Sequence, residues 1–181
     1  EEYWGKFDPT RLNQAMKFYV CQEHRRLGCK SLLEAELEDA GQQAQHCNTL
    51  VLLVGFSLEP LLQSACVYQP KKLVLILNQQ GYPPEGWSEF ACHVTEAIGH
   101  LVEKGLLSQT PQISGKDNRA GHPTDDKPSA VFQMLVEVLH DETDVVIDVT
   151  GGKKSMVSGA YLYAAYAGAR ISYVDFDEYD P

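Results

Sequence analysis

Two adjacent lysines follow two adjacent glycines late in the chain, in an order that could bind an anion. The motif reads Asp148-Val-Thr-Gly-Gly-Lys-Lys-Ser-Met156 and follows an apolar run. Glycines allow consecutive N–H groups to converge on one anion, and a helix starting here adds the partial positive charge of its N-terminus. Two cations in a first helical turn oppose the helix dipole, so a bound phosphate explains Lys153 and Lys154. The alternative is a Gly-Gly turn with solvated lysines. The ligand-binding residues predicted in this loop are Thr150, Gly151, Gly152, Lys153, Lys154, Ser155 and Met156.

A second candidate loop, Val54-Gly-Phe-Ser-Leu-Glu-Pro60, comes directly after another apolar run. Gly55 lets the backbone turn and approach a ligand. Ser57 can cap the next helix or donate to a ligand oxygen, and Glu59 complements the helix dipole. We expect Gly55, Phe56, Ser57 and Glu59 to contact the ligand. The alternative is a plain strand-to-helix turn, with Pro60 at an early helical position.

Two common phosphate-binding motifs are excluded. A P-loop needs a glycine five positions before Gly152, and position 147 is isoleucine. The G-x-G-x-x-G fingerprint is also missing, as is an acidic residue about 20 positions beyond it. Ordinary triphosphate hydrolysis and nicotinamide chemistry therefore lose their best support.

Short apolar runs alternate with helical periodicity along most of the chain. This alternation predicts an α/β fold, a Rossmann-like, mostly parallel sheet flanked by helices, with an N-terminal helical segment before it. Ligands bind such sheets at the carboxyl ends of the strands, near a switch in strand order. We expect strands at 49–55, 72–78, 144–149 and 169–176, a short one within 109–115, a surface loop at 115–127, and helices at 9–28, 31–45, 58–67, 88–105, 129–140 and 153–167.

Composition narrows the classes of partner. The 181 residues carry a net charge of −10, which disfavours binding to a long nucleic acid or to an anionic membrane. No run is long and apolar enough for a membrane span, and no secretory signal opens the chain. The five cysteines have no zinc-site spacing, so we expect reduced thiols in a cytoplasmic protein. The start at Glu1 without methionine suggests a piece of a longer protein.

The two loops, together with Gly159 and the final segment Tyr173-Val-Asp-Phe-Asp-Glu-Tyr179, resemble CARF domains, the CRISPR-associated Rossmann-fold sensors of type III CRISPR systems. The resemblance covers about 48–181, which we expect to be the sensor domain, and leaves 1–47 as a separate helical segment. Many members read Thr-Gly-Gly-Thr-Lys, and Lys153 stands here in place of the second threonine. The resemblance implies a homodimer that binds a cyclic oligoadenylate and allosterically activates a linked effector domain outside this chain, in antiviral defence.

The chemistry of such a ring fits the predicted residues. A two-fold dimer would bring two copies of Lys153 and Lys154 to about four phosphates, which favours cyclic tetra-adenylate. Phe56 could receive an adenine, although a packing role is equally open to it. The amides of Asn78, Gln79 and Gln80 can pair with a base edge.

Three functions remain open at this stage. A sensor without catalytic residues, cofactor or metal is the leading interpretation. A metal-independent ring nuclease is the second, with Ser57, Thr150 and Lys154 stabilising charge while a ribose 2′-OH attacks. An enzyme acting on a phosphorylated metabolite is the third. The acidic residues Asp175, Asp177, Glu178 and Asp180 are expected to form a solvated tail, and Tyr161, Tyr163 and Tyr166 to form core or dimer contacts.

Overall fold

The apolar runs at 49–54 and 72–78 form the two central strands of a parallel sheet. They pair in register from Thr49 opposite Lys72 to Val54 opposite Leu77. The sheet has the order β3-β2-β1-β5-β6, with β4 also paired to β2, and every pairing is parallel. The predicted α/β class is therefore confirmed. The strands are β1 (Thr49–Val54), β2 (Lys72–Asn78), β3 (Gln112–Ser114), β4 (His122–Thr124), β5 (Val145–Asp148) and β6 (Arg170–Ser172).

This structure is a computed structural model, and it describes part of the chain. The described residues are 14, 17–39, 41, 45–55, 58–79, 87–115 and 120–174, with only the backbone at 87–92. Among the predicted ligand contacts, Phe56, Ser57 and Gln80 lie outside these ranges, as do the acidic residues after 174.

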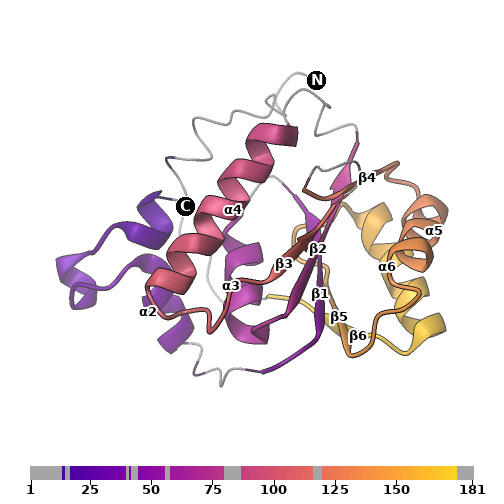
Figure 1. Cartoon of the computed structure of the whole chain (residues 1–181). Coiled ribbons are helices and arrows are strands. Elements are labelled where there is room, and N and C mark those ends of the chain that lie inside the picture. Colours follow the sequence, from indigo (N-terminus) through magenta and orange to yellow (C-terminus); the bar gives the residue numbers. More distant parts are fainter. Residues whose placement is uncertain are drawn as a thin grey trace.

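Four helices cover the sheet, two on each face. Figure 1 shows α3 and α4 on one face and α5 and α6 on the other. The chain passes from β1 outward to β2 and β4, then returns to the opposite side of β1 to form β5 and β6. The strand order therefore switches between β1 and β5, where α/β sheets bind ligands. The helices are α3 (Glu59–Tyr68), α4 (Trp87–Glu103), α5 (Pro128–Val138) and α6 (Lys154–Ala167).

Strand β1 is buried on both faces, which explains its uninterrupted apolar sequence. Because side chains alternate along a strand, Leu50, Leu52 and Val54 pack in the core under α3 and α4. Val51 and Leu53 pack in a second core with α5 and α6. Both layers of helices are thus fixed to the strand whose end forms the first candidate loop.

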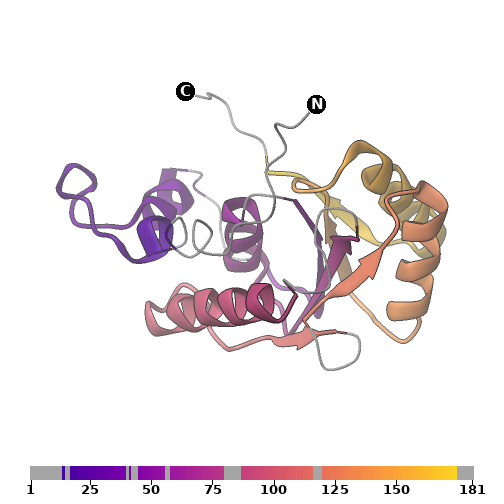
Figure 2. The same ribbon diagram turned by 90° about the horizontal axis from the view of Figure 1, so that it is seen from above.

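The N-terminal segment lies against α3, on the side away from the sheet (Figure 2). It contains the helical turns η1 (Lys17–Cys21) and η2 (Arg25–Leu27) and the helix α2 (Leu32–Asp39). Tyr19 and Leu33 are buried in the same core as the sheet residues beneath α3 and α4. As a result α3 is covered on both sides, and residues 60–66 are all buried. The predicted division of the chain at residue 47 stays a prediction.

Helix α2 begins at a capping box. The Ser31 hydroxyl accepts from the amide of Glu34 at 3.3 Å, and the Glu34 carboxylate accepts from the amide and the hydroxyl of Ser31, both at 2.7 Å. These bonds, led by that of the Ser31 amide, hold the pKa of Glu34 below its usual value.

Two predictions about secondary structure are wrong. A single helix to Gly28 does not form, because the chain leaves η1 at Cys21 and closes a loop in which the His24 amide donates to Lys30 O at 3.0 Å. The predicted surface loop 115–127 contains β4, whose residues His122, Pro123 and Thr124 pair with β2. Proline is tolerated there because β4 is an edge strand and needs no amide donor on its outer side.

Within the described ranges, no helix has the length and apolar character needed to cross a membrane.

Candidate ligand site at the ends of β1 and β5

The two predicted loops meet where β1 and β5 end side by side. A Cβ atom built on Gly55 would lie 2.3 Å from the carbonyl oxygen of Gly151. A Cβ atom on Gly151 would lie 2.5 Å from Leu53 O and 3.0 Å from Gly55 N. No side chain fits at either position without moving backbone. The glycines are therefore required for the close approach of the two loops.

Helix α6 starts immediately after this contact. Its first helical bond runs from the amide of Val157 to Lys153 O at 2.9 Å, so the amides of Lys154, Ser155 and Met156 have no acceptor within the helix. The residue before the helix, Lys153, has an extended backbone and gives no side-chain cap. These amides and the helix dipole suit an anionic ligand.

The two lysines of the loop have different surroundings. Lys153 Nζ lies 3.1 Å from Asp126 Oδ2, an acid between β4 and α5, and both side chains are partly exposed. Lys154 is exposed and has no ion-pair partner among the described residues. Exposed ion pairs contribute little stability. Lys153 can therefore leave Asp126 and bind a phosphate at little cost. Lys154 can bind a phosphate without first losing an ion pair to a described residue.

A buried carboxyl group lies beneath the loop. Asp148, the last residue of β5, has no exposed surface. Its Oδ1 accepts from the amide of Thr150 at 3.0 Å, and its Oδ2 accepts from the hydroxyl of Ser64, on α3, at 2.8 Å. Thr150 Oγ1 in turn accepts from the amide of Val174 at 2.8 Å. The Thr150 hydroxyl keeps its own hydrogen, which can be donated to a ligand oxygen.

Sequence reasoning did not include Asp148 and Ser64 among the site residues. A signal existed for Asp148, which is a single acid at the end of an apolar run and opens the glycine motif. Ser64 gave none, because a serine within a helix is usually solvated. Its burial follows from the packing of α3 against the sheet, where its hydroxyl donates to Asp148.

The remaining predicted residues lie at the same edge with differing exposure. Asn78 is buried at the end of β2, and the exposed Gln79 donates its amide to Thr124 O at 2.9 Å. Glu59 is half-buried in the first turn of α3. Met156 is fully buried in the core beneath α6, so only its backbone amide could reach a ligand.

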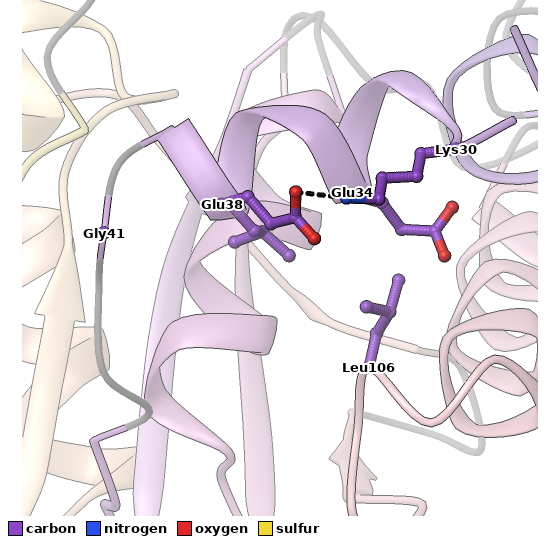
Figure 3. Close-up of a pocket in the computed structure, with 6 residues that line it drawn as sticks. Lys30, Glu34, Glu38, Gly41 and Leu106 are labelled. Carbon is purple, nitrogen blue, oxygen red and sulfur yellow. Dashed lines mark hydrogen bonds and ion pairs between the residues drawn. The ribbon is translucent and has the colours of Figure 1, made fainter. Parts of the chain in front are cut away.

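The hollow drawn in Figure 3 lies elsewhere. It has a volume of about 410 Å³ and is lined by residues of α2, by Lys30 and Gly41 on either side of that helix, and by Leu106, which follows α4. Connections from a helix to the next parallel strand lie at the amino ends of the strands, so this hollow is near the opposite edge of the sheet. Ion pairs of Lys30 with Glu38 and of Lys104 with Glu34 line or border it.

Among the residues that the structure describes, no three His, Cys, Asp or Glu side chains lie close enough together to hold a metal ion. The described cysteines Cys21, Cys29, Cys47 and Cys66 are free thiols. Burial raises the pKa of Cys47 to about 11 and that of Cys66 to about 12, so neither is an activated nucleophile.

Comparison with known proteins finds likeness among solved structures. No family model and no curated protein matches the chain. Among solved structures, the chain is similar to Can2 from Sulfobacillus thermosulfidooxidans in complex with cyclic tetra-adenylate, with a TM-score of 0.49 and 18% identity. The match covers 71% of this chain and 32% of that one, so it spans about a third of the length of Can2.

Proposed function

We propose that the chain is a sensor domain that binds a cyclic oligoadenylate at the ends of β1 and β5. The ring size that we propose is cyclic tetra-adenylate. The observation that carries the proposal is the backbone contact between Gly55 and Gly151, which joins two loops that resemble CARF motifs into one site. The open amides at the start of α6, the Thr150 hydroxyl and Lys154 then supply donors and charge for phosphate oxygens.

The phosphates of a ring suit this combination of groups. Each is a single negative charge, and a lysine ammonium binds such a charge without the planar geometry that arginine requires. The chain as a whole carries a net charge of −10, so the lysines and open amides of this edge would be a local exception to an acidic molecule. A long polyanion would be repelled beyond the edge, whereas a compact ring would not.

A homodimer is the second part of the proposal, and the outer face of α6 supports it. Tyr161, Leu162 and Tyr166 are exposed there, and residues 155–167 contain no Asp, Glu, Lys, Arg or His. Two chains with a charge of −10 can approach along such a face with little repulsion. Since α6 begins at the glycine motif, a contact along α6 about a two-fold axis roughly parallel to the helix would bring two copies of the motif to one side.

The output of the sensor is the third part. Ring binding would change the activity of an effector domain linked to this chain, in a cytoplasmic antiviral response. Cleavage of the bound ring is the alternative function. The Thr150 hydroxyl and Lys154 favour it, because both can stabilise charge beside a reacting phosphate.

Calorimetry on the 181-residue chain tests the proposal. We expect one cyclic tetra-adenylate per two chains and weaker binding of linear tetra-adenylate. Replacing Lys153 and Lys154 together by alanine should weaken binding at least tenfold and make it less sensitive to salt. Replacing Lys30 and Lys71, which are remote from the site, removes the same charge and should change affinity less than threefold.

Two results decide between the functions. No heat with cyclic tri-, tetra- or hexa-adenylate would contradict ring sensing. Chromatography of the ring after incubation at saturation separates a sensor, which leaves the ring intact, from a ring nuclease, which yields linear products.

A further inference from the structure

The Asp148 carboxyl group is the centre of a hydrogen-bonded series that joins three segments of the fold. Ser64 of α3 donates to one of its oxygens, and the amide of Thr150 donates to the other. Thr150 accepts in turn from the amide of Val174, two residues beyond β6. We infer that Asp148 is a positioning residue, which holds the two ligand loops at a fixed separation and connects them to the segment after β6; this inference rests on the proposed function.

The burial of Asp148 indicates that its role is specific. An acid with no exposed surface is unfavourable in a core unless its oxygens are hydrogen-bonded, and an apolar residue would avoid that cost. Each oxygen of Asp148 accepts one hydrogen bond from a described residue, one from α3 and one from the loop after β5. The residue type is therefore explained by the connection it makes and not by core packing.

The bond to Ser64 connects β5 with the helix that follows the first loop. Residues 60–66 of α3 are all buried, so this helix is held by packing on every side and offers a fixed reference. If the bond is lost, no hydrogen bond joins β5 and α3 among the residues that the structure describes. The contact between Gly55 and Gly151, which leaves no room for a methyl group, should then loosen.

The bond to Thr150 turns the backbone sharply at the end of β5. A carboxylate that accepts from the amide two residues later forms an Asx-type turn, and the amide of Gly152 closes the same turn by donating to Val149 O at 3.1 Å. The hydroxyl oxygen of Thr150 also accepts a hydrogen bond from the amide of Val174. A ligand that accepts a hydrogen bond from the same hydroxyl would therefore be connected, through Thr150, to the segment after β6.

Four variants of the full chain test the inference. Ser64→Ala removes only the bond to α3, and Asp148→Ala removes both bonds. Asp148→Asn is the conservative variant, because its amide oxygen can accept from Thr150 and its NH₂ group can donate to the Ser64 oxygen. Thr49→Val is the matched control: it also removes a fully buried hydroxyl that donates to a carboxylate, that of Glu142 at 2.5 Å, but at the opposite edge of the sheet.

We expect Ser64→Ala to weaken cyclic tetra-adenylate binding about tenfold, the effect of one lost hydrogen bond. Asp148→Ala should weaken it more, and Asp148→Asn should restore it to within about threefold of the native chain. The salt dependence of binding should be unchanged in all of them, because the lysines remain. In ¹⁵N spectra of the free chain, Ser64→Ala should shift the amide signals of Gly55, Gly151 and Val174, and Thr49→Val should not.

The spectra separate this inference from the proposed function. If the native chain binds no cyclic tetra-adenylate, the proposed function fails, while the shifts in the free chain still establish or overturn the positioning role. Equal shifts in Ser64→Ala and Thr49→Val, or none in Ser64→Ala, would overturn it. Native affinity in Asp148→Ala would overturn it as well.

Discussion

The carbonyl oxygen of Gly151 occupies the space that a side chain on Gly55 would need, because a Cβ atom there would lie only 2.3 Å from it. Two loops separated by almost a hundred residues in sequence therefore share one packed backbone surface. Steric contact between the two backbones limits how the loops can lie, and the hydrogen bonds of Asp148 act together with it. A ligand that bridges both loops would meet the backbones of Gly55 and Gly151 already in contact.

Substitution of Gly151 by alanine should disrupt this contact. The added methyl group would overlap Leu53 O and Gly55 N, so we expect a loss of about 1–3 kcal/mol in the free energy of unfolding, typical of overpacking, together with weaker ring binding. Urea denaturation gives the first quantity and calorimetry the second. Gly99→Ala is the control: its Cβ has no neighbour within 4 Å in α4, so it should gain up to about 1 kcal/mol in stability.

Substitution of Asp126 by asparagine should strengthen ring binding. The change removes the acid that pairs with Lys153 at 3.1 Å, and the freed ammonium can then contact a phosphate at no cost in ion pairing. We expect a two- to fivefold lower Kd at low salt and a smaller gain at high salt, because exposed charges are screened. Glu137→Gln, which removes one exposed acid from α5, is the control and should leave the Kd unchanged. An unchanged Kd in Asp126→Asn would mean that Lys153 does not touch the ligand.

Substitution of Leu162 by glutamate should separate the proposed dimer. Leu162 is 57% exposed on the uncharged face of α6, and a carboxylate buried between two copies would meet its own counterpart across the two-fold axis. Sedimentation velocity should show monomers at concentrations where the native chain is dimeric. Phe18→Glu changes a comparably exposed apolar residue on the N-terminal segment and should leave the dimer intact. Dimers in Leu162→Glu would exclude this face.

Acid should destabilise the chain partly through Glu142. The hydrogen bond from Lys72 at 2.7 Å, followed by that from Thr49, holds the pKa of Glu142 below its ordinary value. A lowered pKa in the folded state means that the contribution is complete above the unfolded value of about 4.3 and is lost as the pH falls through the folded value. Melting temperatures measured by circular dichroism from pH 3 to 7 should therefore fall less steeply below pH 4.5 in Glu142→Gln. Parallel curves for the variant and the native chain would contradict this assignment.

The central sheet could be predicted because its strands are buried on both faces. Continuous apolar runs such as those of β1 and β2 are typical of such strands, and both were located to within one residue. The three-residue strand β4 could not be predicted, because its sequence His-Pro-Thr has no apolar run or alternation and its position depends on pairing with β2. The helical periodicity before Gly28 was misleading for a similar reason, since backbone bonds between His24 and Lys30 fix the local path.

The residues of the candidate site also fall into those that could be predicted from the sequence and those that could not. The glycine motif and its lysines could be predicted, because unusual backbone freedom and unfavourable charge placement are visible in sequence. The bond of Asp148 to Ser64 joins residues 84 positions apart and depends on how α3 lies against β5. The pairing of Lys153 with Asp126 likewise depends on the position of the β4–α5 connection.

One edge of the sheet consists of two short strands, β3 and β4, and the length of the segment between them does not fix their register with β2. β3 and β4 pair with successive parts of β2, from Lys72 to Val74 and from Ile76 to Asn78, and Gly115 and Gly121 form a bridge between them. Each end of the intervening segment is thus anchored independently to the same strand. This segment is therefore a place where residues could be added or removed, in evolution or in a laboratory insertion, while the sheet and the ligand edge keep their geometry.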